Sequence, residues 1–306
     1  MRRIYALFLV AAFLFTLGMP VALQAQDSRG QNGRPPVGDG SGDGVDPGKV
    51  SIFVQVVIYD VAPASVKAFE SALLATRDLA LAESTLINER VLRNIDDLTT
   101  QYATYAKFTS AVGAEQLYQQ RLVKVQSFCT RTPEIHLAEM TNAYFPEGNT
   151  DRPTGLELGA DRVGQIAHLG LFIPYPRFRS QYDQTLHEVK LVLQGRKSPG
   201  YIGEETSIET ELLSPKQQTP YSPQAFEASK MSVNYGEYDT MENAENAYIV
   251  RHAKPDPKLV HLERNFFSAL QVPTRFFLFQ VVGNYSRPDA VANRNRTIAL
   301  PKGGGR

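Results

Sequence analysis

Two segments of this chain show the same alternation of apolar and polar residues. In the first segment, residues 50–146, a helical apolar stripe covers residues 65–80, and Ser110 is placed to cap a second helix that runs to Phe128. β-Branched and aromatic residues alternate with polar ones in four predicted strands, at 50–61, 85–93, 99–108 and 134–145. The predicted order of elements is therefore β-α-β-β-α-β.

The same order returns in residues 163–287, with helices predicted at 177–194 and from Thr240 onward, where Thr240 is placed to cap the helix. Its predicted strands are 163–173, 207–213, 230–238 and 274–285. Without a gap, FTSAVGAEQLYQQR at 108–121 aligns with YDTMENAENAYIVR at 238–251. The identical positions are Ala114/Ala244, Glu115/Glu245, Tyr118/Tyr248 and Arg121/Arg251. We infer an internal duplication and call the two segments the first and the second repeat.

The remaining segments differ in composition. MRRIYALFLVAAFLFTLGMPVALQA, residues 1–25, has a basic start, an apolar core and a final small residue, which is the order of a secretory signal peptide. Residues 26–49 predict a flexible linker, 147–162 an interdomain linker and 288–306 a disordered tail. We therefore expect an exported protein, periplasmic or extracellular, with no integral membrane segment after signal cleavage.

Charge and composition exclude several classes of function. The chain has 32 basic and 32 acidic residues, and loss of Arg2 and Arg3 with the signal peptide makes it slightly acidic. Nucleic acid is not an expected partner, because the basic residues form no cluster. The single cysteine excludes an intrachain disulfide. No metal-ligand spacing, catalytic triad or phosphate loop is present, and no cofactor is predicted.

The first repeat resembles a known domain family. An opening strand is followed by V-x-P and an amphipathic helix, INERVLRNIDD is an alternating strand, YATYAKF runs into TSAVGA, and EIHLAEMTNAYF follows a proline. This pattern is similar to the antibiotic-biosynthesis-monooxygenase type of dimeric α/β-barrel domain. The resemblance implies an α+β fold of two tandem ferredoxin-like (βαββαβ) units whose antiparallel sheets pair into a barrel. Pairing within the chain would give a pseudo-dimer, and pairing between chains a homo-oligomer.

The resemblance also implies a function. Relatives of this kind include cofactor-independent monooxygenases and binders of small aromatic or hydrophobic molecules. The alternative is a non-enzymatic ligand-binding or structural module of the cell envelope. A third hypothesis is haem binding through His136 or a second-repeat histidine, but haem-degrading relatives use a tryptophan and this chain has none.

An oxygenase pocket needs an apolar wall and a few groups that orient and deprotonate the substrate. Asn88, Arg90 and His136 are the candidate catalytic residues, and Tyr102 and Tyr105 the candidate ligand-binding residues. Strand alternation places Asn88 with Arg90 on one face but separates Tyr102 from Tyr105, so not all can reach one cavity. The alternative is that Asn88 and Arg90 face solvent and that the tyrosines lie in the core or an interface.

The repeated helix is predicted to be structural. Ala114, Leu117, Tyr118 and Arg121 fall on one helical face. We expect Tyr118 to pack against the sheet and Arg121 to bind nearby carbonyls or carboxylates, without a catalytic role.

Overall fold

The computed structural model describes residues 51–95, 100–144, 162–195, 198–210, 229–246, 257–271 and 275–287. All of them belong to one compact unit of the chain, Asp46–Arg306. The predicted signal peptide, the linker at 26–49 and the tail at 288–306 lie outside the described residues, as does the predicted interdomain linker up to residue 161. None of the described helices combines the length and the apolar character that a bilayer-spanning helix needs.

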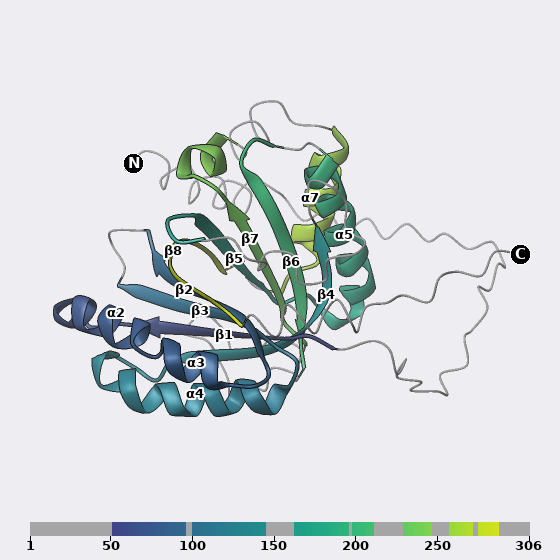
Figure 1. Cartoon of the computed structure of the whole chain (residues 1–306). Coiled ribbons are helices and arrows are strands. Elements are labelled where there is room, and N and C mark those ends of the chain that lie inside the picture. The colour runs from purple at the N-terminus through teal and green to yellow at the C-terminus, as the bar shows by residue number, and fades with distance from the viewer. Residues whose placement is uncertain are drawn as a thin grey trace, which may run out of the picture. The chain divides into compact units, whose positions relative to one another are not determined.

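The described strands form one closed antiparallel barrel in the order β1-β3-β2-β8-β5-β7-β6-β4 (Figure 1). They are β1 (Phe53–Asp60), β2 (Leu86–Asn94), β3 (Gln101–Phe108), β4 (Glu134–Tyr144), β5 (Ile166–Phe172), β6 (Tyr201–Glu209), β7 (Ser232–Tyr238) and β8 (Arg275–Ser286). Each repeat contributes a four-stranded sheet, and the sheets join where β2 pairs with β8 and β4 with β6. The barrel closes within one chain. The predicted fold class, two ferredoxin-like units in a dimeric-α/β-barrel arrangement, is confirmed.

Helices cover the outside of the barrel. They are η1 (Pro63–Ser65), α2 (Val66–Leu74), α3 (Arg77–Ala82), α4 (Ala111–Val125), η2 (Gln126–Phe128), η3 (Pro176–Phe178), α5 (Arg179–Gly195) and α7 (Pro257–Ser268), with a further helical segment at 241–246. Figure 1 shows α2, α3 and α4 together on the outer side of the first-repeat strands. On the second repeat, Phe172 of β5 packs against Tyr182 of α5 and Phe266 of α7.

Strand alternation creates an inner and an outer core. On β1, Val54, Val56 and Ile58 face the barrel interior, where side chains of both repeats meet. Val57 and Tyr59 face the helices and join the outer core of the first repeat. The sheet is thus apolar on both faces, and each face is covered by a different layer.

One predicted strand is wrong in position. The pattern placed it at 207–213, whereas β6 is Tyr201–Glu209. The sequence YIGEET has the composition of a loop, because glycine and adjacent glutamates are rare in strands. Here Glu204 and Glu205 are buried and ion-paired with Lys190 and Lys107, which are distant in the sequence, so the local pattern does not reveal them.

The first predicted helix is divided into α2 and α3. At the junction, the Thr76 hydroxyl donates a hydrogen bond to the carbonyl oxygen of Leu73, which competes with continuation of the helix.

The predicted caps also differ in outcome. The Asn243 N–H donates to Thr240 Oγ1, whereas Ser110 makes no side-chain capping bond.

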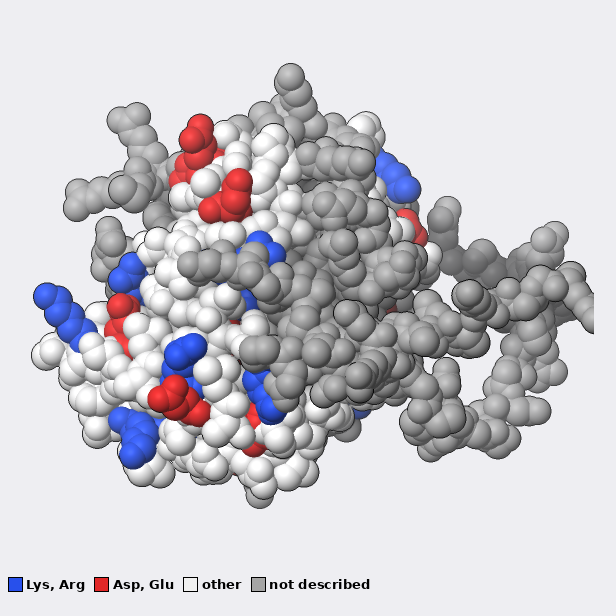
Figure 2. Space-filling model, in the orientation of Figure 1, with Lys and Arg blue, Asp and Glu red and all other residues white. Residues whose placement is uncertain are grey.

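Charges of both signs lie scattered over the uncharged surface in Figure 2. At the protein surface, the exposed side chain of Arg131 forms an ion pair with the half-buried Asp60. Such pairs contribute about 0–1 kcal/mol, so they add little to stability. The fold therefore depends on buried contacts.

Arg121 makes the principal buried ion pair of the outer core. Its Nη1 and Nη2 atoms donate to both carboxylate oxygens of Glu89 on β2, at 2.5 and 2.8 Å. Its Nε donates to Thr76 Oγ1 at 2.9 Å. Arg121 thus joins α4 to β2 and to the α2–α3 junction, and the prediction that it binds a carboxylate is confirmed.

Replacing this arginine should destabilise the protein strongly. Arg121→Met keeps most of the side-chain volume but leaves the Glu89 carboxylate buried without its partner, and we expect a loss of about 3–5 kcal/mol in the free energy of unfolding. Urea unfolding followed by circular dichroism measures it. The matched control is Arg131→Met at the exposed pair, with an expected loss below about 1 kcal/mol. Equal losses in the two variants would contradict the structural role of Arg121.

Candidate functional site

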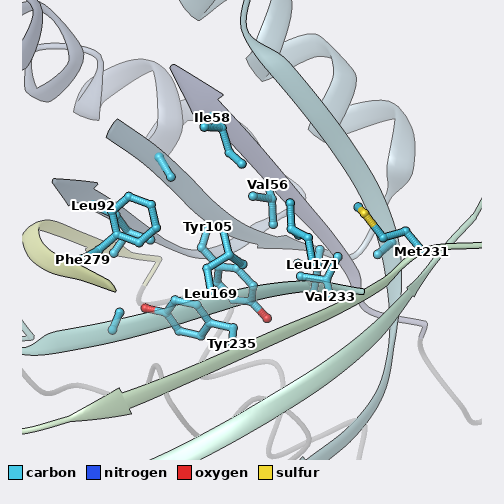
Figure 3. Packing of buried hydrophobic residues seen from close by; sticks show 14 of the residues in the cluster. Val56, Ile58, Leu92, Tyr105, Leu169, Leu171, Met231, Val233, Tyr235 and Phe279 are labelled. Atoms are coloured by element: carbon cyan, nitrogen blue, oxygen red, sulfur yellow. The ribbon is translucent and has the colours of Figure 1, made fainter. Parts of the chain in front are cut away.

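A pair of tyrosines occupies the centre of the barrel interior. Tyr105 of β3 and Tyr235 of β7 stack with their ring centroids 3.9 Å apart and their planes inclined by 11°. Figure 3 shows the rings face to face, with their hydroxyl oxygens pointing in opposite directions. Apolar residues, among them Val56, Leu169 and Val233, surround the rings. Each hydroxyl therefore leaves the apolar region on its own side.

The Tyr105 hydroxyl ends at a buried ion pair. It donates to Glu205 Oε2 at 2.8 Å, and Lys107 Nζ donates to Glu205 Oε1 at 2.6 Å. Lys107 follows Tyr105 by two residues on β3 and so points to the same face. Glu205 comes from β6 of the other repeat. The Lys107 and Glu205 side chains are 1 % and 0 % exposed.

The Tyr235 hydroxyl ends at a second buried ion pair. It donates to Glu237 Oε1 at 2.7 Å, and Arg90 Nε donates to the same oxygen at 2.9 Å. Arg90 Nη1 also donates to Asn284 Oδ1 on β8, and Arg162 Nε lies 3.9 Å from Glu237 Oε2. We call the interior polar group the central cluster. Its members are Arg90, Tyr105, Lys107, Glu205, Tyr235 and Glu237.

In the central cluster the two tyrosines keep their protons, and each charged side chain lies beside one of opposite charge. Burial raises the pKa of Tyr105 and of Tyr235 well above the usual value, and the neighbouring carboxylates raise it further. Both tyrosines are therefore hydrogen-bond donors at neutral pH. Buried charges lower folding stability relative to a well-packed apolar core, and perturbed buried groups mark candidate functional sites.

Acceptor capacity remains unused in the same region. Asn88 Oδ1 and Glu237 Oε2 are buried without a hydrogen-bond partner among the described residues. Asn88 lies directly opposite Lys107 in the β2–β3 ladder. A buried acceptor of this kind is rare in folded proteins and is ordinarily satisfied by water or a ligand. Two buried acceptors thus lie beside the ion pairs of the central cluster without a hydrogen bond from a described residue.

The structure brings three of the predicted site residues together. Asn88, Arg90 and Tyr105 face the barrel interior and are 2 %, 1 % and 2 % exposed. The alternative that Asn88 and Arg90 face solvent is wrong, because the sheet of the second repeat covers the face that an open sheet would expose. Tyr102 lies on the outer face, as alternation predicted, and its hydroxyl donates to Glu70 of α2. It does not belong to the central cluster.

His136 faces the interior but contacts a different group. Its Nδ1 lies 2.7 Å from Glu209 Oε1 and its Nε2 lies 2.8 Å from Glu134 Oε1. Arg275 donates to both oxygens of Glu134. Glu134 and Arg275 begin β4 and β8, and Glu209 ends β6, so these residues lie at one end of the barrel. We call Glu134, His136, Glu209 and Arg275 the end cluster.

This geometry does not fit haem ligation by His136. Iron coordination needs a free ring nitrogen, and carboxylate oxygens hold both nitrogens of this side chain. Within the described ranges, no group of three or more His, Cys, Asp or Glu side chains is placed to bind a metal ion.

Sequence reasoning did not identify four members of the central cluster. Tyr235 had a signal in the repeat, since its spacing from Tyr105 equals that between Ala114 and Ala244. Lys107 had a signal in strand alternation, two residues after Tyr105. Glu237 had the same signal, two residues after Tyr235. Glu205 had none, because its role depends on partners in the other repeat.

Comparisons with known proteins support the fold. No family model matches the sequence, and no curated protein matches it either. An anthrone oxidase-like protein superposes with a TM-score of 0.60 at 12% identity, over 78% of this chain and 94% of the other. A protein from Fusobacterium nucleatum subsp. nucleatum, proposed to be a monooxygenase, gives 0.55 at 7% identity over 78% and 95%. One from Lactobacillus acidophilus, also proposed to be a monooxygenase, gives 0.52 at 6% identity over 78% and 97%.

The fold is that of the dimeric α/β barrels. At these identities the similarity concerns the fold, and it covers nearly the whole of each related structure. The resemblance noted in the sequence is confirmed at this level.

The end cluster should make stability depend on pH. Burial alone would raise the pKa of Glu134, but hydrogen bonds from His136 and Arg275 lower it to about 2. Burial alone would lower the pKa of His136, but Glu134 and Glu209 raise it overall. The Glu134 contribution is present above its unfolded pKa and is lost as pH falls towards 2. The His136 contribution is present below its unfolded pKa of about 6.5 and is lost as pH rises through the folded value.

The free energy of unfolding should therefore fall on both sides of a maximum. Urea titrations across acidic, neutral and alkaline pH measure it. In the His136→Gln variant we expect the free energy of unfolding to fall less steeply as the pH rises, because glutamine does not titrate. An unchanged alkaline limb in this variant would contradict the linkage.

Proposed function

We propose that this protein is a cofactor-independent monooxygenase that binds a small aromatic molecule inside the barrel and removes a proton from it. The observation that supports this is the central cluster, where carboxylates, phenols and cations lie together in an otherwise apolar interior. Apolar walls with a few convergent polar groups are the usual construction of a small-molecule site. The fold, shared with an anthrone oxidase-like protein, agrees with the proposal.

Different residues of the barrel interior accept the proton, stabilise the anion and orient the substrate. Glu205 accepts a proton from an acidified C–H or O–H group of the substrate, as a general base. Lys107 and the Tyr105 hydroxyl, which bind Glu205 in the structure, then stabilise the negative charge on the substrate. Asn88 and Arg90 face the same interior and orient the substrate oxygen.

The reaction balances with dioxygen alone. A substrate CH2 group loses both hydrogens, a new C–O bond forms, and the O–O bond breaks. One oxygen atom becomes the carbonyl of the product and the other leaves as water. The CH2 group supplies all four electrons that reduce dioxygen.

Binding requires a change at the tyrosine pair. Their 3.9 Å stack occupies the centre of the interior, so a planar substrate separates the rings or displaces one. An aromatic pair contributes about 0.5–1.5 kcal/mol beyond burial. A substrate ring that stacks on either tyrosine restores a contact of the same kind, which favours aromatic ligands over aliphatic ones.

A second candidate is a non-enzymatic ligand-binding or structural module of the cell envelope. The observation in its favour is that Glu205 and Glu237 already have cationic partners and that the tyrosine rings already stack on each other. The barrel would then be a closed body whose interior serves stability.

The proposal includes export, which rests on the pattern of residues 1–25. Sequencing the N-terminus of the protein purified from its native cells tests this. We expect the mature chain to begin near Gln26, and an intact Met1 on the secreted or periplasmic protein would contradict cleavage.

Oxygen uptake tests the activity. With anthrone as substrate, we expect the wild-type protein to consume oxygen and Glu205→Gln to do so about 100-fold more slowly or worse, since a general base contributes at least that much. Tyr105→Phe should also be slower, because it removes the hydroxyl that stabilises the anion. Tyr102→Phe is the matched control: it makes the same change on the same strand but on the outer face, and should keep the wild-type rate.

The results separate the candidates. An equal rate in Glu205→Gln and wild type would remove Glu205 from the mechanism. Absence of uptake, together with no thermal shift on adding the aromatic compounds, would favour the structural module. A Soret band in the absorption spectrum of the purified protein would revive the haem hypothesis through a histidine other than His136.

A further inference from the structure

Equivalent residues of the two repeats meet inside the barrel. Tyr105 and Tyr235 have the spacing of Ala114 and Ala244 in the repeated helix, so they are the same position of the duplicated unit. They stack on each other. In a two-fold arrangement, a residue on the axis meets its own counterpart. The tyrosine pair therefore marks an approximate two-fold axis that runs through the barrel.

A second pair of equivalent residues meets at the end of the barrel. Glu134 lies opposite Ile58 in the β1–β4 ladder, and Arg275 lies opposite Leu171 in the β5–β8 ladder. Ile58 and Leu171 each stand five residues before the 3-10 helix that follows their strand, η1 or η3. Glu134 and Arg275 are thus equivalent, yet their charges are opposite. They form a two-bond ion pair, in which Nη2 lies 2.8 Å from Oε2.

The central cluster also has equivalent positions that carry opposite charges in the two repeats. Arg90 and Glu205 each lie directly opposite the stacked tyrosine of their own repeat, so they are equivalent. Lys107 and Glu237 each follow that tyrosine by two residues, so they are equivalent too. The ion pairs cross from one repeat to the other, Arg90 with Glu237 and Lys107 with Glu205. At each of these positions the two repeats carry opposite charges.

We infer that these interior charges make each repeat complementary to the other repeat and repulsive to a copy of itself. In a barrel built from two first repeats, Glu134 would face a second Glu134, and Arg90 would face Lys107. In a barrel built from two second repeats, Glu205 would face Glu237. Like charges buried together are a strong determinant against a wrong partner. The partner of the first repeat is therefore a second repeat, from the same chain or from another copy.

The apolar and aromatic contacts do not carry this selectivity. Tyrosine meets tyrosine, and aliphatic residues from both sheets pack around the two rings. Such contacts would serve a pair of like repeats equally well. The selectivity thus resides in six residues whose positions carry opposite charges in the two repeats, which are Arg90, Lys107, Glu134, Glu205, Glu237 and Arg275.

Charge reversal in the full-length chain tests the inference. E134R and R275E each place like charges together, and we expect each to unfold at lower urea than wild type. The double variant E134R/R275E exchanges residues between equivalent positions, so we expect it to regain most of the lost stability. The matched control is E89R/R121E, a buried two-bond pair within the first repeat whose positions are not equivalent. This double variant should be no more stable to urea than the single variants E89R and R121E.

Mixing the two single variants gives an independent readout. The first repeat of R275E keeps Glu134, and it can pair with the second repeat of E134R, which keeps Arg275. The two remaining repeats form a second barrel, in which the arginine introduced by E134R meets the glutamate introduced by R275E. After joint unfolding and refolding, we expect light scattering to detect a species of twice the chain mass that neither variant forms alone.

The inference is overturned if E134R/R275E is no more stable than its single variants, or if the control pair recovers to the same degree. It is also overturned if either single variant alone forms a twofold-mass species, because like charges would then pair.

Discussion

The fold depends on one constraint: the sheet of each repeat is apolar on both faces. On β1, Val54 and Val56 point one way and Val57 and Tyr59 the other, and all of them are buried. Each aliphatic side chain removed from water contributes about 1.5–3 kcal/mol, so neither face can be left uncovered. Helices cover the outer face, and a second curved sheet is the layer that fits the inner one. Duplication within the chain supplies that sheet.

Closure of the barrel determines where charge can be placed. A charged side chain on the inner face of one sheet is cut off from water, and its partner must come from the inside of the barrel. Arg90 and Lys107 of the first repeat find Glu237 and Glu205 of the second. The same contacts therefore specify the pairing of the repeats and assemble the groups proposed for proton transfer.

Local patterns in the sequence predicted most of the fold but only part of the site. The alternation on β2 and β3 placed Asn88 and Arg90 on one face and separated Tyr102 from Tyr105, and the structure agrees. Strand β6 was misplaced because its adjacent glutamates resemble a loop until their buried partners are known. Whether Asn88 and Arg90 face solvent or interior depends on the junctions of β2 with β8 and β4 with β6. Pairing across these junctions leaves no periodic signal in either strand.

Of the ion pairs that the described residues form between the two repeats, the Glu134–Arg275 pair of the end cluster is the most exposed. The side chains of Glu134 and Arg275 are 20 % and 14 % exposed, whereas those of Arg90 and Glu237 are 1 % and 0 % exposed. Breaking a buried pair leaves two desolvated charges, but a partly solvated pair exchanges its partner for water at smaller cost. An aromatic ligand that enters the barrel would therefore open Glu134 from Arg275 before it disturbs the central cluster. Since Glu134 and Arg275 belong to different repeats, the most solvated of these ion pairs is also a contact between the repeats.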